Sequence, residues 1–473
     1  MSDCTRSCMQ QSAIKSYDVR GIVGKDFIEQ DTYFFVRALL DFLQKNNHDP
    51  IQKIIIGYDH RATSKTIEQF VVQACVDFGV HNLFVLCVPT PVLQFAMHQG
   101  FADVGIMITA SHNPLHYNGL KLWYKTQSLQ GSALQSIWQS MQSQQYRLPV
   151  LQRVACLQST DFIMQAYYNF LDKQFSMLHN MQYSVLCMVS GGPVQSLLEW
   201  CIQHFAWQHV DIVGCKNNRE CIVFNPDPTS LETQTFIKDV LSNKTYDCVL
   251  AFDGDADRFV LYTSQGKILS GDEVGFLFVQ YMGGVSAVMD IKTSGGLVHV
   301  LQEKGVQVIL APTGCADIKK AIYEHNAQFG CEVSGHYFFK EHHFIDDGLY
   351  AALSFLQCAV QAGCLHDVCA ALPPLHDSVE MRLPLGTAFD RDLVVNYLHD
   401  TVCKQYGEDI NLIDGIRYHT EIGWLMMRAS KTEPVLSLRY GVFDVHYKAE
   451  WVKIVKECIQ PFIVQAVIEK YEW

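Results

Sequence analysis

The stretch KIIIGYDHRATSKTIEQFVVQACVDFGVHNLFVLCVPTP, residues 53–91, decides the fold class of this chain. Residues 53–59 form a short apolar run that ends in polar residues, and residues 67–78 repeat apolar side chains at helical spacing. A second apolar run at 83–88 ends at a Pro-Thr-Pro sequence, and a further run follows at 102–109. The order strand, helix, strand, strand predicts a parallel sheet with helices on both faces.

The same alternation restarts twice further along the chain. Strand-like runs follow at residues 183–189, 246–252, 285–290 and 306–311. Helical patterns are found at residues 161–171, 197–205, 232–241, 273–281 and 298–304. Because each restart repeats the order of strands and helices, we predict three α/β domains of similar topology.

The C-terminal part of the chain follows a different pattern. Beyond a Leu-Pro-Pro-Leu sequence, strand-like and helical stretches mix at residues 378–383, 393–402, 424–429 and 451–463. This mixture is typical of an α+β domain. We therefore expect four domains, with boundaries at residues 1–155, 156–262, 263–373 and 374–473.

Composition narrows the possible partners and the compartment. The chain has 473 residues, 49% of them hydrophobic, and a formal net charge of -13, which disfavours nucleic acid or an anionic membrane as the main partner. Its 17 cysteines are scattered, with no CxxC pair, and we expect reduced thiols in a cytoplasmic protein. The N-terminus lacks an apolar signal region and no window reaches about 18 apolar residues, so we expect neither a signal peptide nor a membrane span.

The first chemically informative stretch is TASHNP, residues 109–114, which follows an apolar run and precedes Lys121. It does not match the GxSxG nucleophile elbow. Ser111 and His112 are adjacent, which predicts a poor geometry for a Ser–His catalytic pair. Three interpretations of Ser111 follow from the local residues: a nucleophile, a phosphate carrier, or a hydroxyl that caps a turn closed by Pro114.

The second stretch is DGDADR, residues 253–258, directly after the apolar run YDCVLAF. Asp253, Asp255 and Asp257 alternate in a short loop, where their charges repel one another unless a cation lies between them. Oxygen ligands of this kind suit Mg²⁺, and the spacing does not fit an EF-hand. The alternative is a solvated acidic turn.

Two further stretches are suited to binding sugars and phosphates. In GCEVSGHYF, residues 330–338, Glu332, Ser334 and His336 alternate, so that in an extended loop they would project to one side. RASKTEP, residues 428–434, combines cations and hydroxyls as a phosphate-binding loop does. The alternatives are an ordinary edge of a sheet and an exposed hairpin. The Glu-His-His sequence at 341–343 fits no common zinc spacing and is expected to be a surface loop.

Taken together and in this order, the four stretches resemble the α-D-phosphohexomutase family, in its phosphomannomutase/phosphoglucomutase branch. Supporting stretches are YDVRG at 17–21, GYDHR at 57–61, PTP at 89–91, YNGLK at 117–121 and DIK at 290–292. The resemblance implies four domains around a central cleft: three similar mixed α/β domains and a C-terminal TBP-like α+β domain. The chain has no P-loop, GxGxxG or HExxH motif, the usual markers of nucleotide-driven kinases, Rossmann dehydrogenases and zinc proteases.

The resemblance also implies roles by matched position. Ser111 would carry the phosphoryl group and, with Asp253, Asp255 and Asp257, would hold Mg²⁺. The remaining catalytic residues would be Arg20, Lys121, Arg258, Lys292 and His336, with Lys121 or His336 moving a proton. Glu332 and Ser334 would contact sugar hydroxyls. The non-reacting phosphate would be held by Arg428, Ser430, Thr432 and Arg439.

The implied reaction interconverts hexose 6-phosphate and hexose 1-phosphate, of mannose, glucose or both, through a hexose 1,6-bisphosphate. Partners would be small sugar phosphates, with no nucleic acid and no membrane, and the protein would be a monomer or homodimer. Two alternatives stay open within enzymes: a phosphoglucosamine mutase-like enzyme, or a phosphotransferase that releases the bisphosphate. A third alternative is a sugar-phosphate-binding protein that has lost catalysis.

The chain departs from the family pattern at three places. Pro312 and Cys315 stand where the family often has a cation and an imidazole. The sequence CMVSGGP at 187–193 replaces an Asp and a Gly-Ala-Gly turn, and Lys431 replaces an Asn. We expect these changes to affect substrate range and rate rather than the class of reaction.

Overall fold

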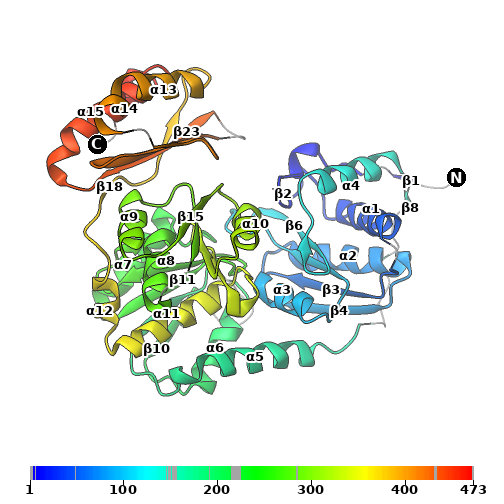
Figure 1. Ribbon diagram of the computed structural model, residues 1–473. Coiled ribbons are helices and arrows are strands. Elements are labelled where there is room, and N and C mark those ends of the chain that lie inside the picture. Colours follow the sequence, from blue (N-terminus) through cyan, green and yellow to red (C-terminus); the bar gives the residue numbers. More distant parts are fainter. Residues whose placement is uncertain are drawn as a thin grey trace. The chain divides into compact units, whose positions relative to one another are not determined.

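Three neighbouring parallel strands form one side of the first sheet in the computed structural model (Figure 1). They are β3 (Lys53–Tyr58), β4 (Asn82–Cys87) and β5 (Val104–Ile108), and α2 (Ser64–Phe78) links the first two, as predicted. The Pro-Thr-Pro sequence does not only end β4, because Thr90 begins a further helix, α3 (Thr90–His98). Pro91 lies in the first turn of α3, where a missing backbone N–H costs nothing.

The prediction of a purely parallel sheet is wrong at one edge. β6 (Tyr117–Tyr124) runs antiparallel to β5, and β2 (Val19–Ile22) and β7 (Gln127–Ser128) run antiparallel to β6. The strand order is β2-β6-β5-β3-β4. The loop between β5 and β6 is too short for the crossover of a dozen or more residues that a parallel connection needs.

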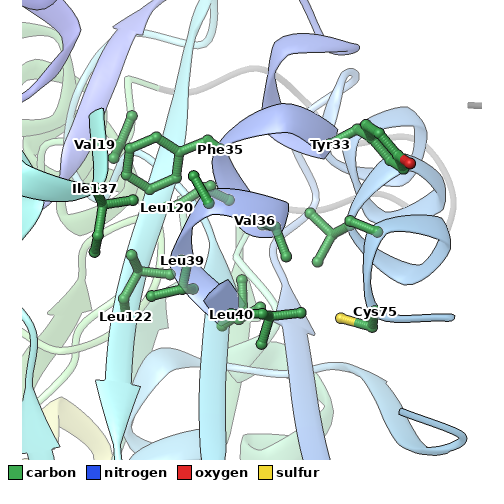
Figure 2. Packing of buried hydrophobic residues seen from close by; sticks show 14 of the residues in the cluster. Val19, Tyr33, Phe35, Val36, Leu39, Leu40, Cys75, Leu120, Leu122 and Ile137 are labelled. Atoms are coloured by element: carbon green, nitrogen blue, oxygen red, sulfur yellow. The ribbon is translucent and has the colours of Figure 1, made fainter. Parts of the chain in front are cut away.

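Helix α1 (Asp31–Asn46) supplies much of the apolar core of this domain. Phe35 and Leu39 are fully buried and lie close to Leu120 on β6 and to Ile137 on α4 (Ser132–Ser143), as Figure 2 shows. Burial of side chains of this size is worth roughly 1.5–3 kcal/mol each. Apolar packing therefore holds α1 against the sheet. The polar residues of the TASHNP stretch lie instead in a loop at the carboxyl end of a strand.

The second and third sheets repeat the same plan. The second has the order β10-β9-β11-β12-β13 and the third has β15-β14-β16-β17. In each, three parallel strands are followed by an antiparallel strand, as in the first sheet. Their strands are β9 (Val185–Met188), β10 (Val210–Val213), β11 (Cys248–Phe252), β12 (Phe259–Thr263), β13 (Ile268–Leu269), β14 (Ala287–Asp290), β15 (Val308–Ala311), β16 (Phe329–Cys331) and β17 (Tyr337–Phe339).

Eight helices of the described residues surround these two sheets; the first five match the predicted helical patterns to within a few residues, and the last three were not predicted. They are α5 (Asp161–Phe175), α6 (Val194–His204), α7 (Leu231–Asn243), α8 (Gly271–Met282), α9 (Gly295–Glu303), α10 (Cys315–His325), α11 (Gly348–Ala362) and α12 (Leu365–Ala370). The fold class predicted from the sequence, a mixed α/β protein of several domains, is confirmed.

The C-terminal sheet is antiparallel throughout, with the order β18-β23-β22-β21-β20 and β19 beside β23. Its strands are β18 (His376–Asp377), β19 (Met381–Pro384), β20 (Ile410–Asn411), β21 (Ile416–His419), β22 (Gly423–Ala429) and β23 (Val435–Val442). Its helices are α13 (Arg391–Tyr397), a π-helical turn (Leu398–Val402), α14 (Cys403–Tyr406), α15 (Lys448–Ile459) and α16 (Gln465–Ile468). Trp451 of α15 is fully buried and anchors this helix to the sheet.

The chain forms two units: Met1–Leu269 with Ile345–Gln361, and Ser270–Phe344 with Ala362–Trp473. The structure describes residues 4–5, 7–47, 49–144, 146–147, 151, 157–190, 192–214, 225–283, 286–407, 409–430 and 434–470.

A short pair, β1 (Cys4–Thr5) with β8 (Tyr146–Arg147), joins distant parts of the first domain. Across the described residues, no helix has the length and apolar character that a membrane crossing requires. The four-domain boundaries stay a prediction.

The repeated plan places three of the four chemical stretches at equivalent positions. TASHNP connects β5 to β6, DGDADR connects β11 to β12, and the turn of Glu332 to His336 connects β16 to β17. Each of these loops leaves the carboxyl end of a parallel strand and enters an antiparallel one. Carboxyl ends of strands are where open α/β sheets bind ligands.

Candidate active site

Ser111 lies at the tip of the loop between β5 and β6, in a strained backbone conformation. Its φ is 50°, in the left-handed region that residues with a side chain rarely adopt. The side chain is 1% exposed, and its hydroxyl donates to Oδ2 of Asp253 at 2.8 Å. Its Oγ also lies 3.3 Å from Nδ1 of His112. The predicted poor geometry of this Ser–His pair is thus wrong in distance, because the left-handed turn brings the two successive side chains to one side.

Arg61 holds this loop in place. Its guanidinium is buried and donates to four backbone carbonyls, those of Ser111 (2.6 Å), Asn113 (2.7 Å), Pro114 (2.8 Å) and Tyr117 (3.1 Å). It also pairs with Asp59 at 3.1 Å. We did not predict this role for Arg61, although the position of Asp59 and Arg61 just beyond the carboxyl end of β3 is a signal that could have found it.

The acidic loop between β11 and β12 is buried, so the alternative of a solvated acidic turn is wrong. Asp253 and Asp255 are 0% exposed and Asp257 is 3% exposed, and one oxygen of each lies within 4.8 Å of the others. Lys121 of β6 donates to Asp255 at 2.6 Å and to Asp257 at 2.5 Å. Thr90, the first residue of α3, donates to Asp255 through both its hydroxyl and its backbone N–H.

Burial and mutual repulsion set the charges of this cluster. Burial, with repulsion from Asp257 and Asp255, holds the pKa of Asp253 well above its usual value. Burial also acts to raise the pKa of Asp255, but the adjacent Lys121 outweighs it and lowers this pKa to about 2. The two carboxylates likewise outweigh burial at Lys121 and hold its pKa well above the usual value. A cation bound among these three buried carboxyl groups would relieve the repulsion that, added to burial, raises the pKa of Asp253.

These residues fit a hard divalent cation. The buried Oδ1 of Asp255 has no hydrogen-bond partner among the residues that the structure describes, and such an oxygen is normally satisfied by a donor or a metal. The ligands are oxygens alone, which is the set that Mg²⁺ prefers. The buried triad can therefore hold a divalent metal ion.

Close backbone approach explains one glycine in the acidic loop. A Cβ at Gly254 would lie 2.6 Å from the carbonyl oxygen of Ser111, which is closer than real Cβ contacts occur. The loop of the first sheet and the loop of the second therefore touch through their backbones. Any side chain at position 254 would separate Ser111 from the three carboxylates.

Two predicted cations lie around Ser111. Arg20 of β2 pairs with Asp18 and donates to Oδ1 of Asn113 at 2.8 Å. The backbone N–H of Arg258 donates to Asp253 at 3.2 Å, and its Nε lies 3.9 Å from the same carboxyl group. The structure thus brings together the predicted residues Arg20, Ser111, Lys121, Asp253, Asp255, Asp257 and Arg258 in one unit.

The residues predicted to contact the sugar lie in the other unit, in a tight turn. Glu332 accepts from the backbone N–H of Gly314 at 2.8 Å and from the thiol of Cys315 at 3.3 Å. The N–H of Glu332 bonds to the carbonyl of His336 at 3.0 Å, which closes a hairpin between β16 and β17. The expectation of an extended loop is therefore wrong, because the antiparallel strand that follows forces a reversal. Ser334 is half-buried at the tip of this turn and His336 is buried.

A second expectation in this region also fails. His342, expected in a surface loop, is fully buried within a short 3₁₀ turn (Lys340–His342). Its neighbours Glu341 and His343 are exposed. Three successive polar residues in the sequence do not reveal that the middle one is buried while its two neighbours are exposed.

Three predicted site cations, the catalytic Lys292 and the phosphate-binding Arg428 and Arg439, are engaged in ion pairs within the second unit. Arg428 pairs with Asp414 at 2.7 Å, and Lys292 pairs with Glu380 at 3.1 Å. Arg439 is 7% exposed and donates through Nη1 to Asp272 (3.1 Å) and to the carbonyl of Lys292 (2.7 Å).

The phosphate loop and the departures from the family pattern are described only in part. Ser430 bonds through its N–H to the carbonyl of Val435 at 2.9 Å. Lys431 and Thr432 lie outside the described residues, as does Gly191 of the 187–193 stretch. Cys187 is buried inside β9, where burial raises the pKa of its thiol to about 12, so it is a core residue without reactivity.

Comparison with known proteins agrees with this fold and shows the family. Models of phosphoglucomutase/phosphomannomutase α/β/α domain I and domain III match residues 11–147 and 270–375, together more than half of the chain. A phosphoglucomutase of Neisseria gonorrhoeae is 29% identical over 431 residues, covering 90% of this chain and 92% of the relative. A phosphomannomutase/phosphoglucomutase of Pseudomonas aeruginosa is 29% identical over 473 residues, covering 96% of each chain.

The solved structures agree at the level of the fold. A phosphoglucomutase/phosphomannomutase family protein from Burkholderia thailandensis superposes with a TM-score of 0.80 at 21% identity, covering 96% of this chain and 98% of that one. The matched family models and the curated relatives place the chain in the class of sugar-phosphate mutases. This chain belongs to the α-D-phosphohexomutase family, as the four sequence stretches indicated.

Proposed function

We propose that this protein is a phosphohexomutase that interconverts hexose 6-phosphate and hexose 1-phosphate, of mannose, glucose or both. The observation that carries the proposal is the placement of the Ser111 hydroxyl, 2.8 Å from Asp253 within a buried triad of carboxylates and beside Lys121. The names of the similar proteins, phosphoglucomutase and phosphomannomutase/phosphoglucomutase, support the same reaction.

Ser111 is proposed to carry the phosphoryl group between two oxygens of the sugar. Transfer to the substrate breaks the bond between phosphorus and Oγ and forms one to a sugar hydroxyl, whose proton leaves. The resulting hexose 1,6-bisphosphate reverses its orientation in the site, and its other phosphoryl group is then transferred to Oγ. Phosphoryl transfer depends mainly on positioning and charge neutralisation, so a rigid loop clamped by Arg61 suits it.

The charged residues around Ser111 have distinct proposed roles. Asp253, Asp255 and Asp257 would hold Mg²⁺, which when bound neutralises charge on the transferring phosphoryl group. Lys121, whose pKa is held well above its usual value, stays protonated and contributes a fixed positive charge. His336 is the proposed proton carrier, since a neutral imidazole can both accept and donate. Arg20, Arg258 and Lys292 would neutralise the remaining phosphate charge.

Recognition of the rest of the substrate is assigned to the second unit. Glu332 and Ser334 would bind sugar hydroxyls, and the non-reacting phosphate would be held by Arg428, Ser430, Thr432 and Arg439. Arg439 would bind the phosphate through nitrogens other than Nη1 or by releasing Asp272. We also propose that the enzyme acts in the cytoplasm, as a monomer or homodimer, and that its partners are sugar phosphates rather than nucleic acid or membrane.

The test combines mass spectrometry with assays of the Ser111→Ala variant. We expect the purified protein to carry one phosphate on Ser111, and the variant to lose interconversion of 1- and 6-phosphates while keeping its fold. Ser128→Ala, at an exposed serine of β7, is the matched control and should keep full activity. Robust mutase activity in Ser111→Ala would overturn the proposal.

The same assay separates the alternative functions. Rates on glucose 1-phosphate, mannose 1-phosphate and glucosamine 1-phosphate, with and without added hexose 1,6-bisphosphate, give the preferred sugar. A preference for glucosamine 1-phosphate would assign the enzyme to the phosphoglucosamine mutase-like alternative, and net release of bisphosphate would indicate a phosphotransferase. Tight binding of sugar phosphate without turnover would mark a protein that has lost catalysis.

A further inference from the structure

A second cluster of metal-ligating side chains lies on the surface of the first unit, at the ends of two helices. Asp172 belongs to α5, His179 follows that helix, and His204 is the last residue of α6. Nε2 of His204 lies 2.7 Å from Oδ1 of Asp172, and Nε2 of His179 lies 3.6 Å from the same oxygen. The three ligand atoms are within 4.8 Å of one another. None of these residues takes part in the proposed mutase reaction.

The backbone around the two histidines is fixed by hydrogen bonds between the two segments. The N–H of Asn180 donates to the carbonyl of Phe205 at 2.8 Å, and the indole of Trp207 donates to the carbonyl of Leu178 at 2.8 Å. Phe205 and Trp207 are buried. The positions of His179 and His204 are therefore set by the core beneath them and do not depend on a ligand.

Aromatic packing further restricts the imidazole rings. The ring of His204 stacks on Trp200, with centroids 4.4 Å apart and an interplanar angle of 12°. Trp200 in turn stacks on Tyr168 at 4.3 Å. The edge of Phe205 contacts both His179 and His204, at 5.1 Å each. Rings held in this way lose little conformational freedom when they bind a metal.

The chemistry of this cluster differs from that of the acidic triad. Two imidazoles and one carboxylate are ligands for Zn²⁺ and related transition metals, whereas Mg²⁺ prefers oxygen. The cluster is open to solvent, because the side chains of Asp172, His179 and His204 are 47%, 41% and 35% exposed. A metal bound here would keep water in its remaining positions. In the absence of metal, a hydrogen bond from His204 to Asp172 lowers the pKa of this carboxyl group.

We propose that Asp172, His179 and His204 form a surface site for a divalent transition metal of the zinc and nickel type, separate from the magnesium site of the reaction. A bound ion would join the C-terminal end of α5 to that of α6. It would stabilise the fold, because the ligands are assembled only in the folded chain.

The experiment titrates the full-length protein with Ni²⁺ in the presence of saturating Mg²⁺. Ni²⁺ is chosen because it binds imidazole well, while Zn²⁺ is also taken up by cysteine thiolates. We expect one ion bound per chain by calorimetry, quenching of the fluorescence of Trp200, and a higher melting temperature. Trp200→Phe should remove the quenching but retain the calorimetric signal.

Substitutions of single histidines decide whether the cluster is the site. We expect His179→Gln and Asp172→Asn each to weaken Ni²⁺ binding by at least about tenfold, since each removes one ligand. His209→Gln, at an exposed histidine outside the cluster, is the matched control and should bind as the unchanged protein does. Undiminished binding in His179→Gln, or an equal loss in His209→Gln, would overturn the proposal, as would absence of any Ni²⁺ binding.

Discussion

Buried charge is neutralised by different partners in two regions of the molecule, here named the acidic centre and the basic centre. The acidic centre of the first unit contains the three carboxylates of the DGDADR loop and one ammonium, that of Lys121. The basic centre of the second unit contains the guanidiniums of Arg417 and Arg439, whose Cζ atoms lie 5.1 and 5.6 Å from the ring centre of Trp424. Arg417 is 2% exposed.

The difference lies in how each centre is neutralised. The guanidiniums donate to backbone carbonyls, those of Ile291 and Thr293 for Arg417 and that of Lys292 for Arg439, and Arg439 also pairs with Asp272. The fold itself supplies those acceptors. Nη2 of Arg417 has no hydrogen-bond partner among the described residues. The carboxyl groups of the acidic centre accept mainly from side chains, those of Ser111, Thr90 and Lys121, and Oδ1 of Asp255 has no donor among the described residues. We infer that a bound cation completes the acidic centre, whereas in the basic centre the folded chain supplies acceptors to Arg417, and Arg439 is shared between the fold and the proposed phosphate.

The largest expected effect tests the acidic centre. Asp255→Asn removes one ligand and one charge, and we expect kcat/KM to fall by about 10³–10⁵-fold, the range that a single cation contributes to phosphoryl transfer. The thermal stabilisation that Mg²⁺ gives the unchanged protein should vanish in the variant. Steady-state kinetics and melting curves with and without Mg²⁺ measure both effects.

Asp239→Asn, at an exposed aspartate of α7, is the control and should behave as the unchanged protein. If Asp255→Asn kept its response to Mg²⁺, the contrast between a centre completed by metal and one completed by the fold would fail.

The two centres also show how much of the fold and of the site can be predicted from the sequence. Most of the parallel strands, the helices with clear periodicity and the chemical stretches were predictable, because hydrophobic periodicity and the strand-end position of DGDADR are local properties. Helices α1, α10 and α11 were not predicted. The antiparallel edge strands depend on the lengths of the loops that precede them, and hydrophobic periodicity does not contain this information. The tight turn at Glu332 depends on β17, a strand of three residues that leaves little periodic signal.

The contacts that support the site were less predictable than the site itself. Arg61 and Thr90 act on Ser111 and Asp255, residues that are distant in sequence and meet only in the folded chain. The engagement of Arg439 by Asp272 is likewise a tertiary contact. A motif names the residue that does chemistry, but not the neighbour that holds it in position.

The second prediction compares two buried arginines, one from each unit: Arg61, which holds the Ser111 loop, and Arg417 of the basic centre. Arg61→Met removes donors to four carbonyls and leaves Asp59 buried without its cation, so we expect a loss of about 3–5 kcal/mol in the free energy of unfolding of the first unit. Thermal and urea melting curves measure it. Activity should fall as well, because the Ser111 loop loses its clamp.

Arg417→Met is the matched variant in the basic centre. Its guanidinium donates to only two carbonyls, so we expect a smaller loss of about 1–3 kcal/mol. A larger loss in Arg417→Met than in Arg61→Met would show that the basic centre is the more tightly coupled of the two.

The third prediction concerns the pH dependence of the second unit. Burial, with repulsion from Glu332 and Asp272, raises the pKa of Asp290 to about 7 despite the opposing cations Lys292 and Arg439. The folded chain therefore binds a proton more tightly than the unfolded chain, and stability falls as the pH rises from about 4 to about 7. We expect this group to lower the free energy of unfolding by roughly 2–4 kcal/mol over that range.

The variant Asp290→Asn isolates the effect. Its free energy of unfolding should lack this pH-dependent component, so the difference between variant and unchanged protein should shift in favour of the variant between pH 5 and pH 8. Asp367→Asn, at an exposed aspartate of α12, controls for general titration. A difference that does not vary with pH would show that folding leaves the pKa of Asp290 unchanged, and would contradict this prediction.

The smallest effect is expected at Cys315, where the thiol donates to Glu332 at 3.3 Å. Glu332 is also held by the backbone N–H of Gly314 at 2.8 Å, so the carboxylate keeps a partner when the thiol is removed. We expect Cys315→Ser to change KM for the hexose phosphate by less than about threefold, and Cys315→Ala by about five- to tenfold, since one net hydrogen bond is worth about 1 kcal/mol. Equal, large increases in KM in both variants would mean that the thiol itself contacts the sugar. Cys315 would then resemble the acidic centre, because its polar atom would be completed by a ligand and not by the fold.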